Sequence, residues 1–241
     1  MNMLSSKKMC LTALMLGLAG FVLRWGLYRV GFDGRGLLVS WHPLTLGLVL
    51  LTALMLVLAV VWGLGQQKGL CRAPEGRLVA LGDGLAALGL LHSLLTAGTL
   101  NRGILILGFV TALCLIAAGI FHCRGRQPYF LTYGALCVFL AAYLVNRYRI
   151  WSQNPQLLDF LPALLAGIAI MLYAYQMTAG CLSQCSRRSW LVLGGLGAFA
   201  GLVGAAGGEM PGFCLGGALW ILTGLWSGTR EGKADHEDEL T

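Results

Sequence analysis

The sequence predicts an all-α protein, a polytopic bundle of about eight transmembrane helices with both termini in the cytoplasm. Hydrophobic residues make up 57% and charged residues only 11% of its 241 residues, whereas roughly a quarter of the residues in a soluble domain are charged. A bilayer core needs roughly 20 apolar residues per helix, so eight such runs use most of the chain. We therefore expect one transmembrane domain over residues 1–228 and no separate soluble catalytic domain.

Proline and tryptophan positions set the limits of the predicted spans. Pro43, Pro162 and Pro211 fall in the first turn of a predicted helix, where a missing N–H has no partner to lose. All seven tryptophans lie near predicted ends, where indole rings favour the headgroup region. The last two runs are short and glycine-rich, so a re-entrant hairpin is an alternative there. The predicted spans are 9–30, 44–64, 78–99, 103–122, 129–145, 161–179, 190–207 and 211–226.

The orientation follows from the cytoplasmic bias of lysine and arginine. With the N-terminus inside, 11 of the 17 basic residues fall on the cytoplasmic side and 17 − 11 = 6 on the other. We expect a multi-pass protein of the plasma membrane, in which the net charge of +7 reflects topology and anionic headgroups rather than nucleic-acid binding. A cleaved signal peptide is an alternative for the first run, but seven further spans make an anchored first helix simpler.

Three ionisable residues lie within predicted spans, where a charge is costly and marks a functional candidate. Arg24 and His92 lie at similar depth near the outer leaflet, so they could share one polar site. Asp83 stands nine positions before His92, which puts the two on opposite faces of a helix at about 100° per residue. The structural alternatives are that Arg24 reaches outward to headgroups, that Asp83 pairs with Arg77 or another cation at the cytoplasmic end, and that His92 makes an ordinary interhelical hydrogen bond.

The outer connections carry a second set of ionisable residues, which we treat as a candidate outer rim. A Tyr-Arg pair precedes each of the two groups, and a helix begun by proline follows each. This pattern hints at two related four-helix halves, 9–122 and 129–226, with a shared anion site between them. The rim residues are Arg29, Arg35, His42, Arg147, Arg149 and Asp159.

Glycine is the most patterned residue type, with 35 copies. Five glycines of the seventh span recur at alternating steps of three and four, so they form one stripe on a helix. Small residues let helices approach closely in lipid, so the stripe predicts tight packing of the last two helices. The alternatives are a glycine-lined pore or a dimer contact. The stripe consists of Gly194, Gly197, Gly201, Gly204 and Gly208.

One stretch in the N-terminal quarter runs from Arg24 through Gly36, Leu37 and Leu38 to His42, Pro43 and Leu44. This stretch is similar to a pattern in uncharacterised multi-span membrane proteins of anaerobic Gram-positive bacteria. The resemblance implies a bacterial plasma membrane and no particular activity. At the other end of the chain, residues 229–241 become acidic and are predicted to be a disordered cytoplasmic tail.

The sequence leaves two hypotheses of function. No catalytic or nucleotide motif is present, so an enzyme is disfavoured and no cofactor is expected. A grouping of Cys181 and Cys185 with His122 and Cys123 lacks metal-ligand spacing, so no metal is expected. The first hypothesis is a small-solute or ion transporter that uses the ionisable residues within the spans. The second is a non-transporting subunit or scaffold that binds a membrane protein partner, or a second copy, through the glycine stripe.

Overall fold

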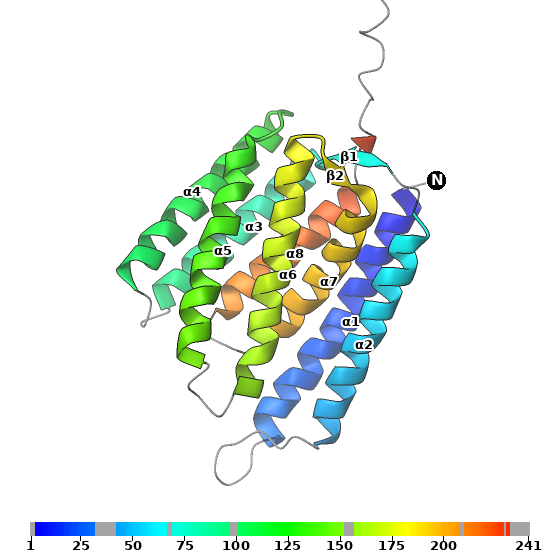
Figure 1. Ribbon diagram of the computed structural model, residues 1–241, viewed down its shortest axis with the longest axis vertical. Helices are drawn as coiled ribbons and strands as arrows, with labels where there is room; N and C mark the ends of the chain where they lie inside the picture. The colour runs from blue at the N-terminus through cyan, green and yellow to red at the C-terminus, as the bar shows by residue number, and fades with distance from the viewer. Residues whose placement is uncertain are drawn as a thin grey trace, which may run out of the picture.

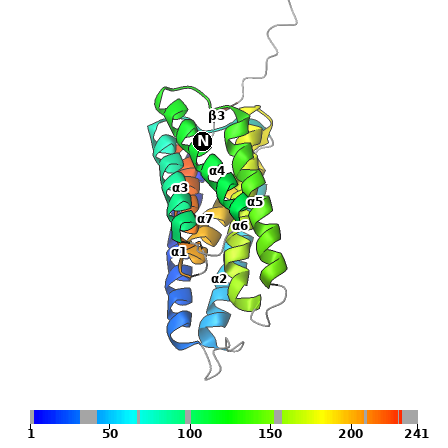
Figure 2. The same cartoon turned by 90° about the vertical axis from the view of Figure 1, so that its left-hand side faces the viewer.

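The computed structural model describes residues 3–31, 42–66, 69–96, 101–151, 157–207, 210–228 and 230–231. Within these residues eight α-helices pack side by side and run along nearly one direction (Figure 1, Figure 2). This arrangement confirms the predicted all-α helical bundle. The helices are α1 (Met3–Val30), α2 (Pro43–Leu64), α3 (Arg77–Thr96), α4 (Arg102–Cys123), α5 (Phe130–Trp151), α6 (Leu157–Cys181), α7 (Arg187–Ala205) and α8 (Pro211–Ser227).

Seven of these helices, α1 to α7, are long and apolar enough to cross a membrane. The chain is therefore an integral membrane protein. Helix α8 has 17 residues, which at 1.5 Å per residue span about 25 Å, slightly less than the roughly 30 Å of a hydrocarbon core. Both α7 and α8 are continuous helices, and they pack against each other.

Several helices extend beyond the predicted spans. Helix α1 begins at Met3 and so includes Lys7 and Lys8, and α5 continues to Trp151. Apolar runs mark only the part of a helix in hydrocarbon, whereas the backbone hydrogen bonds continue toward the headgroups. Helix α6 begins at Leu157, so Pro162 lies inside the helix and not in its first turn as predicted.

Helix α8 occupies the centre of the bundle, packed mainly against α3 and α7. Glycines make these approaches close. A Cβ added at Gly216 would lie 2.6 Å from the Leu85 carbonyl oxygen, and one added at Gly89 would overlap the Gly212 carbonyl oxygen. Backbone therefore meets backbone between α3 and α8, and no larger residue fits there without moving one helix.

The glycine stripe on α7 faces other helices of the same chain. A Cβ at Gly201 would lie 2.9 Å from Ala218 Cβ on α8, and one at Gly204 would lie 2.7 Å from Ala166 Cβ on α6. The stripe's other described members are buried against the same two helices, and Gly208 lies outside the described residues. The described part of the stripe is thus filled from within the chain and lines neither a pore nor a free surface.

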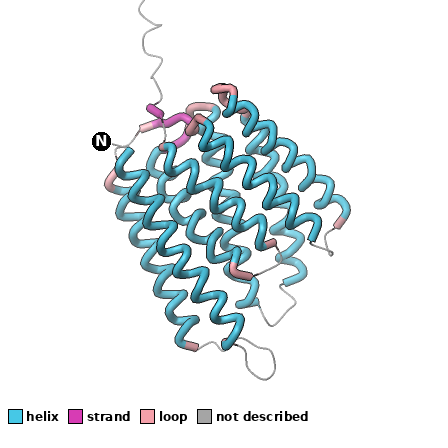
Figure 3. The backbone as a smooth tube through the Cα atoms, turned by 180° about the vertical axis from the view of Figure 1, so that it is seen from behind, coloured by secondary structure: helices cyan, strands magenta, loops and turns pink. Residues whose placement is uncertain are grey.

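A small antiparallel sheet, which the sequence did not predict, lies at one end of the bundle (Figure 3). Its strands are β1 (Leu70–Arg72), β2 (Cys185–Ser186) and β3 (Arg230–Glu231), in the order β2-β1-β3. Strand β3 falls at the start of the predicted disordered tail, and residues 229 and 232–241 lie outside the described residues. We call this end of the bundle, which also holds the start of α1, the strand end, and the opposite end the loop end.

Candidate functional site

Asp83 lies on α3 near the strand end and is fully buried, with 0% of its surface exposed. The preceding residue, Gly82, explains how α8 comes so close. A Cβ at Gly82 would overlap the Thr223 hydroxyl and lie 3.2 Å from the Cα atom of Trp220. The Gly82-Asp83 pair therefore brings a carboxyl group into the protein interior instead of to the lipid or the headgroups.

Two side chains from other helices meet this carboxyl group. The Tyr133 hydroxyl on α5 donates a hydrogen bond of 3.0 Å to Asp83 Oδ1. His122 Nε2 on α4 lies 3.0 Å from the Tyr133 hydroxyl and 3.7 Å from Asp83 Oδ2. All three side chains are at most 1% exposed. We call Asp83, His122 and Tyr133 the Asp–His–Tyr cluster.

The hydrogen bonds assign one proton of the cluster. Tyrosine has a single hydroxyl hydrogen, and Tyr133 gives it to Asp83. The hydroxyl oxygen must then accept from His122, so Nε2 of that ring carries a hydrogen. The other ring nitrogen, Nδ1, is buried and has no hydrogen-bond partner within the described part of the chain. The imidazole can therefore be neutral, or can take a second proton on Nδ1 and face the Asp83 carboxylate as a cation.

An aromatic wall encloses the cluster on the side of α8. The Trp220 ring stacks on Tyr133 at a centroid distance of 5.6 Å, and Tyr173 of α6 meets Trp220 edge-on at 5.0 Å. Trp190 lies 6.3 Å from Tyr173. Trp190 and Trp220 are 2% and 1% exposed, so both indole rings face the protein interior and not lipid headgroups. Trp190 stands in the first turn of α7, whereas Trp220 stands near the middle of α8 and not near a helix end as predicted.

Several buried polar atoms around the cluster make no hydrogen bond of ordinary length among the described residues, although Trp220 interacts with the Asp83 carboxyl group and Trp190 with the Tyr173 hydroxyl. A buried polar group without a partner costs about 1–3 kcal/mol, so native proteins hold few of them and each calls for a reason. Their concentration around one carboxyl group marks this part of the interior as the candidate site. The atoms are Asp83 Oδ2, His122 Nδ1, Tyr173 Oη, Trp190 Nε1 and Trp220 Nε1.

Arg24 is also buried, at 2% exposure, but its surroundings differ. Its Nη1 donates to the Val203 carbonyl oxygen of α7 at 2.9 Å, and its Nη2 donates to the Tyr28 hydroxyl at 3.2 Å. The guanidinium group also lies over the Tyr28 ring at 5.6 Å. Arg24 therefore turns inward onto α7 and does not reach outward to the headgroups.

His92 has an exposed side chain and lies beside the first turn of α8. A Cβ at Gly212 would lie 2.8 Å from His92 Nδ1. The interhelical hydrogen bond expected of His92 is made by its neighbour, because Ser93 Oγ accepts from the Phe213 backbone N–H at 2.8 Å. Arg24 thus contacts α7 and His92 contacts α8. Asp83 also differs from its expected pairing with Arg77, because its contacts are with Tyr133 and His122.

Three of the described outer-rim residues contact residues close to them in the chain. His42 caps α2, and its Nδ1 accepts from the Leu44 N–H at 3.3 Å. Arg29 stacks on Trp25 of the same helix at 4.9 Å. Arg147 is 2% exposed and lies over the Tyr143 ring at 5.8 Å, again on one helix.

Arg149, also a rim residue, is exposed and borders an apolar hollow on α5. Arg35 and the side chain of Asp159 lie outside the described residues. Among the described rim residues, Arg29, His42 and Arg147 thus contact residues close to them in the chain, and Arg149 lies on the surface of α5.

His122, Tyr133 and Tyr173 were not recognised from the sequence as partners of Asp83. A depth argument would have found the first two, because His122 ends the predicted fourth span and Tyr133 lies near the start of the fifth. The connection from α4 to α5 lies at the strand end, so His122 and Tyr133 are both close to that end (Figure 1). Asp83 is also close to the strand end of its own helix, α3, and therefore lies at a similar depth. Tyrosine itself gave no signal, since it is common at membrane interfaces.

Comparison of the chain with known protein families, curated proteins and solved structures gives no match. Within the described ranges, no group of three or more His, Cys, Asp or Glu side chains is placed to hold a metal ion. The site must therefore be interpreted from its own chemistry.

Proposed function

We propose that the protein is a proton-linked transporter of a small solute or ion, in which the Asp–His–Tyr cluster takes up and releases the coupling proton. One observation carries the proposal. A fully buried carboxyl group within a predicted span has titratable partners, His122 and Tyr133, where a structural ion pair would have lysine or arginine. Ionisable residues inside transmembrane segments are commonly parts of ion or proton pathways.

The free-energy cost of a buried charge links proton exchange at this position to the entry of water. A carboxylate with an imidazolium, or a carboxylic acid with a neutral imidazole, leaves the pair without net charge. Gain or loss of one proton then leaves a net charge in a site of low dielectric constant, where the penalty is several kcal/mol per ion. Such a charge favours any conformation that admits water. Protonation and water access are therefore linked, and this linkage is what a proton-coupled conformational change requires.

The contact between α3 and α8 offers a route for that change. Glycines on both helices leave little side-chain interdigitation there, since Gly89 meets Gly212 and Gly216 meets Leu85 backbone to backbone. Helices that meet through such flat surfaces can slide by small shear motions. Because Asp83 is on α3 and Trp220 is on α8, a slide would separate the aromatic wall from the cluster and admit water.

The alternative of a non-transporting subunit or scaffold has less support. Its sequence argument was the glycine stripe as a contact for a partner protein, and the described stripe glycines contact α6 and α8 of the same chain. We further propose the plasma membrane as the location, with the strand end in the cytoplasm, because this orientation puts the basic residues Lys8, Arg72, Arg124 and Arg188 on the cytoplasmic side.

The test is solute-induced proton movement in proteoliposomes that contain a pH-sensitive dye. A panel of amino acids, sugars, nucleosides, carboxylates, organic amines and alkali cations is added outside in turn. We expect at least one solute to change the internal pH, and Asp83→Asn to abolish the change while remaining monodisperse. The same substitution in the tail, Asp235→Asn, is the matched control and should leave the signal intact. A signal retained in Asp83→Asn would contradict the proposal.

A further inference from the structure

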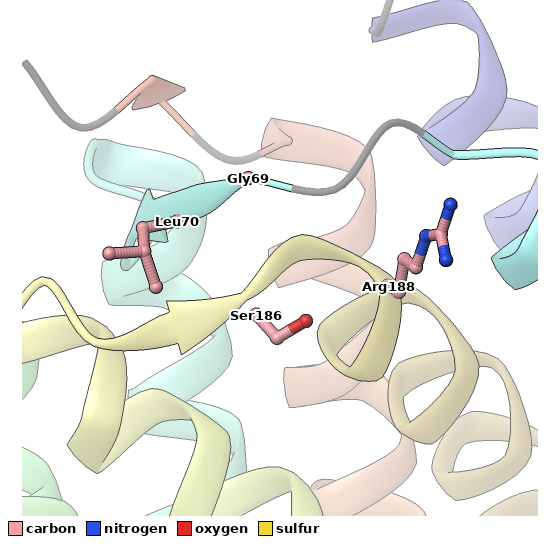
Figure 4. A pocket seen from close by; sticks show the side chains of 4 residues that line it. All are labelled: Gly69, Leu70, Ser186 and Arg188. Carbon is pink, nitrogen blue, oxygen red and sulfur yellow. The ribbon is translucent and has the colours of Figure 1, made fainter.

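A groove at the strand end opens between α2 and α6. Helix α7 packs against both, and α2 and α6 share no extensive contact, so α7 forms the floor of the groove. A hollow at its end is lined by Gly69, Leu70, Ser186 and Arg188 (Figure 4). Arg188 lines both the hollow and the groove, so the two lie next to each other. The groove residues are Val60, Gly63, Leu64, Gln176, Arg188, Ser189, Val192 and Leu193.

The strand end of the groove is polar and positively charged. Arg188 Nε donates to the Gln66 carbonyl oxygen at 2.7 Å, which fixes the side chain, and no hydrogen bond of its two Nη atoms exists within the described ranges. Ser186 is the N-cap residue of α7, but its hydroxyl makes no capping hydrogen bond. The first turn of α7 adds the positive end of a helix dipole. Figure 4 shows both Ser186 and Arg188 at this junction, with the Arg188 guanidinium group directed away from the Ser186 hydroxyl.

The remainder of the groove is apolar and faces the surroundings of the bundle. Val60 and Leu64 on α2 are 42% and 66% exposed. Val192 and Leu193 on α7 line the floor of the groove. These residues belong to two candidate membrane spans. The apolar part of the groove therefore opens to lipid, and Arg188 stands at the boundary with the headgroups.

We propose that this groove is a binding site for one anionic phospholipid. The phosphodiester lies on the Arg188 guanidinium group and the Ser186 hydroxyl, and one acyl chain lies along Val60, Leu64 and Val192. A guanidinium group offers two parallel N–H donors that match two phosphate oxygens. A zwitterionic lipid would bring a second cation next to Arg188, and inorganic phosphate would leave the apolar part of the groove uncovered. Charge and shape together thus select an anionic lipid.

The test compares the unfolding temperature in neutral detergent with added phosphatidylglycerol and with phosphatidylcholine of the same acyl chains. A ligand that binds only the folded state raises this temperature by an amount that grows with the logarithm of its concentration divided by its dissociation constant. We expect phosphatidylglycerol to raise the unfolding temperature more than phosphatidylcholine does. In Arg188→Gln, about tenfold more phosphatidylglycerol should be needed, in line with the loss of a charge-assisted contact. Arg124→Gln removes an exposed charge at the same end and should behave like the unmodified protein.

A second pair of variants tests the apolar part without touching Arg188. Val60→Trp fills the groove from an exposed position, and Val57→Trp adds the same bulk one turn away, outside the groove. We expect only the first to weaken the response to phosphatidylglycerol. Equal responses to the two lipids, equal losses in Arg188→Gln and Arg124→Gln, or a full response to inorganic phosphate alone would each overturn the proposal.

Discussion

The two ends of the bundle each bury a charged side chain, and they do so in opposite ways. Near the loop end, Arg24 donates to the Val203 carbonyl oxygen and the Tyr28 hydroxyl. A guanidinium group stays charged at any physiological pH, so these contacts do not depend on pH. Toward the strand end, Asp83 meets His122 and Tyr133, and the charge of His122 depends on pH. Burial alone therefore does not distinguish a structural charge from a functional one, whereas the chemistry of the partners does.

The contact between α3 and α8 should show the largest effect, because both helices run between the two ends. Gly89→Leu forces a side chain against the Gly212 backbone, so we expect loss of the folded protein. Gly84→Leu changes the same helix where an added Cβ meets nothing within 4 Å, and it should fold. Size-exclusion chromatography in detergent compares the two. Similar elution profiles would mean that the close approach of α3 to α8 is not required.

Arg24→Ala should lower the free energy of unfolding by about 2–4 kcal/mol, because it removes two hydrogen bonds of a charged group and leaves a cavity on α7. Solute-induced proton movement per folded molecule should stay unchanged. Unfolding in mixed detergent micelles measures the first quantity and the proteoliposome assay the second. If Arg24→Ala were stable but inactive, the loop end would be the functional one and the comparison would be reversed.

His122→Gln should have the opposite effects to Arg24→Ala, with a small loss of stability and a large loss of proton movement. Glutamine can still donate to the Tyr133 hydroxyl but cannot take a second proton, so stability should fall by only about 1–2 kcal/mol. Proton movement should be lost. Tyr133→Phe removes the hydroxyl group that bonds both Asp83 and His122 and should cost about 1–3 kcal/mol, with reduced but measurable proton movement. Full activity in His122→Gln would exclude the imidazole from the proton step.

The smallest expected effect is a difference in labelling rate between cysteines of the unmodified protein, in which no residue is substituted. Cys123 is exposed, whereas Cys71 and Cys185 are buried and face each other across β1 and β2. The hydrogen bond with Cys71, and then desolvation, raise the pKa of the Cys185 thiol above its usual value, so little reactive thiolate forms at neutral pH. A maleimide should modify Cys123 first, and modification of Cys185 should become faster only as the pH rises. Mass spectrometry after digestion reads the order of modification. Early modification of Cys185 would show that the small sheet is not closed.

The sequence predicted the helical bundle because long apolar runs leave few other structures in a membrane. It also singled out Asp83 and Arg24 as ionisable residues within spans. It could not predict their partners. Which way Tyr133, Trp190 and Trp220 face depends on helix rotation, and an almost uniformly apolar helix carries little information about rotation. The sheet was missed for a different reason, since two- and three-residue strands far apart in sequence have no periodic pattern to recognise.

Infrared difference spectroscopy of the carboxyl C=O stretch during a pH titration tests the central claim most directly, because it detects protonation without requiring a known solute. The proposed proton exchange predicts a band of a protonated carboxylic acid that grows as the pH falls, is absent in Asp83→Asn, and changes position in His122→Gln. Titration spectra of Asp83→Asn identical to those of the unmodified protein would show that Asp83 does not exchange a proton, and would contradict the proposed function.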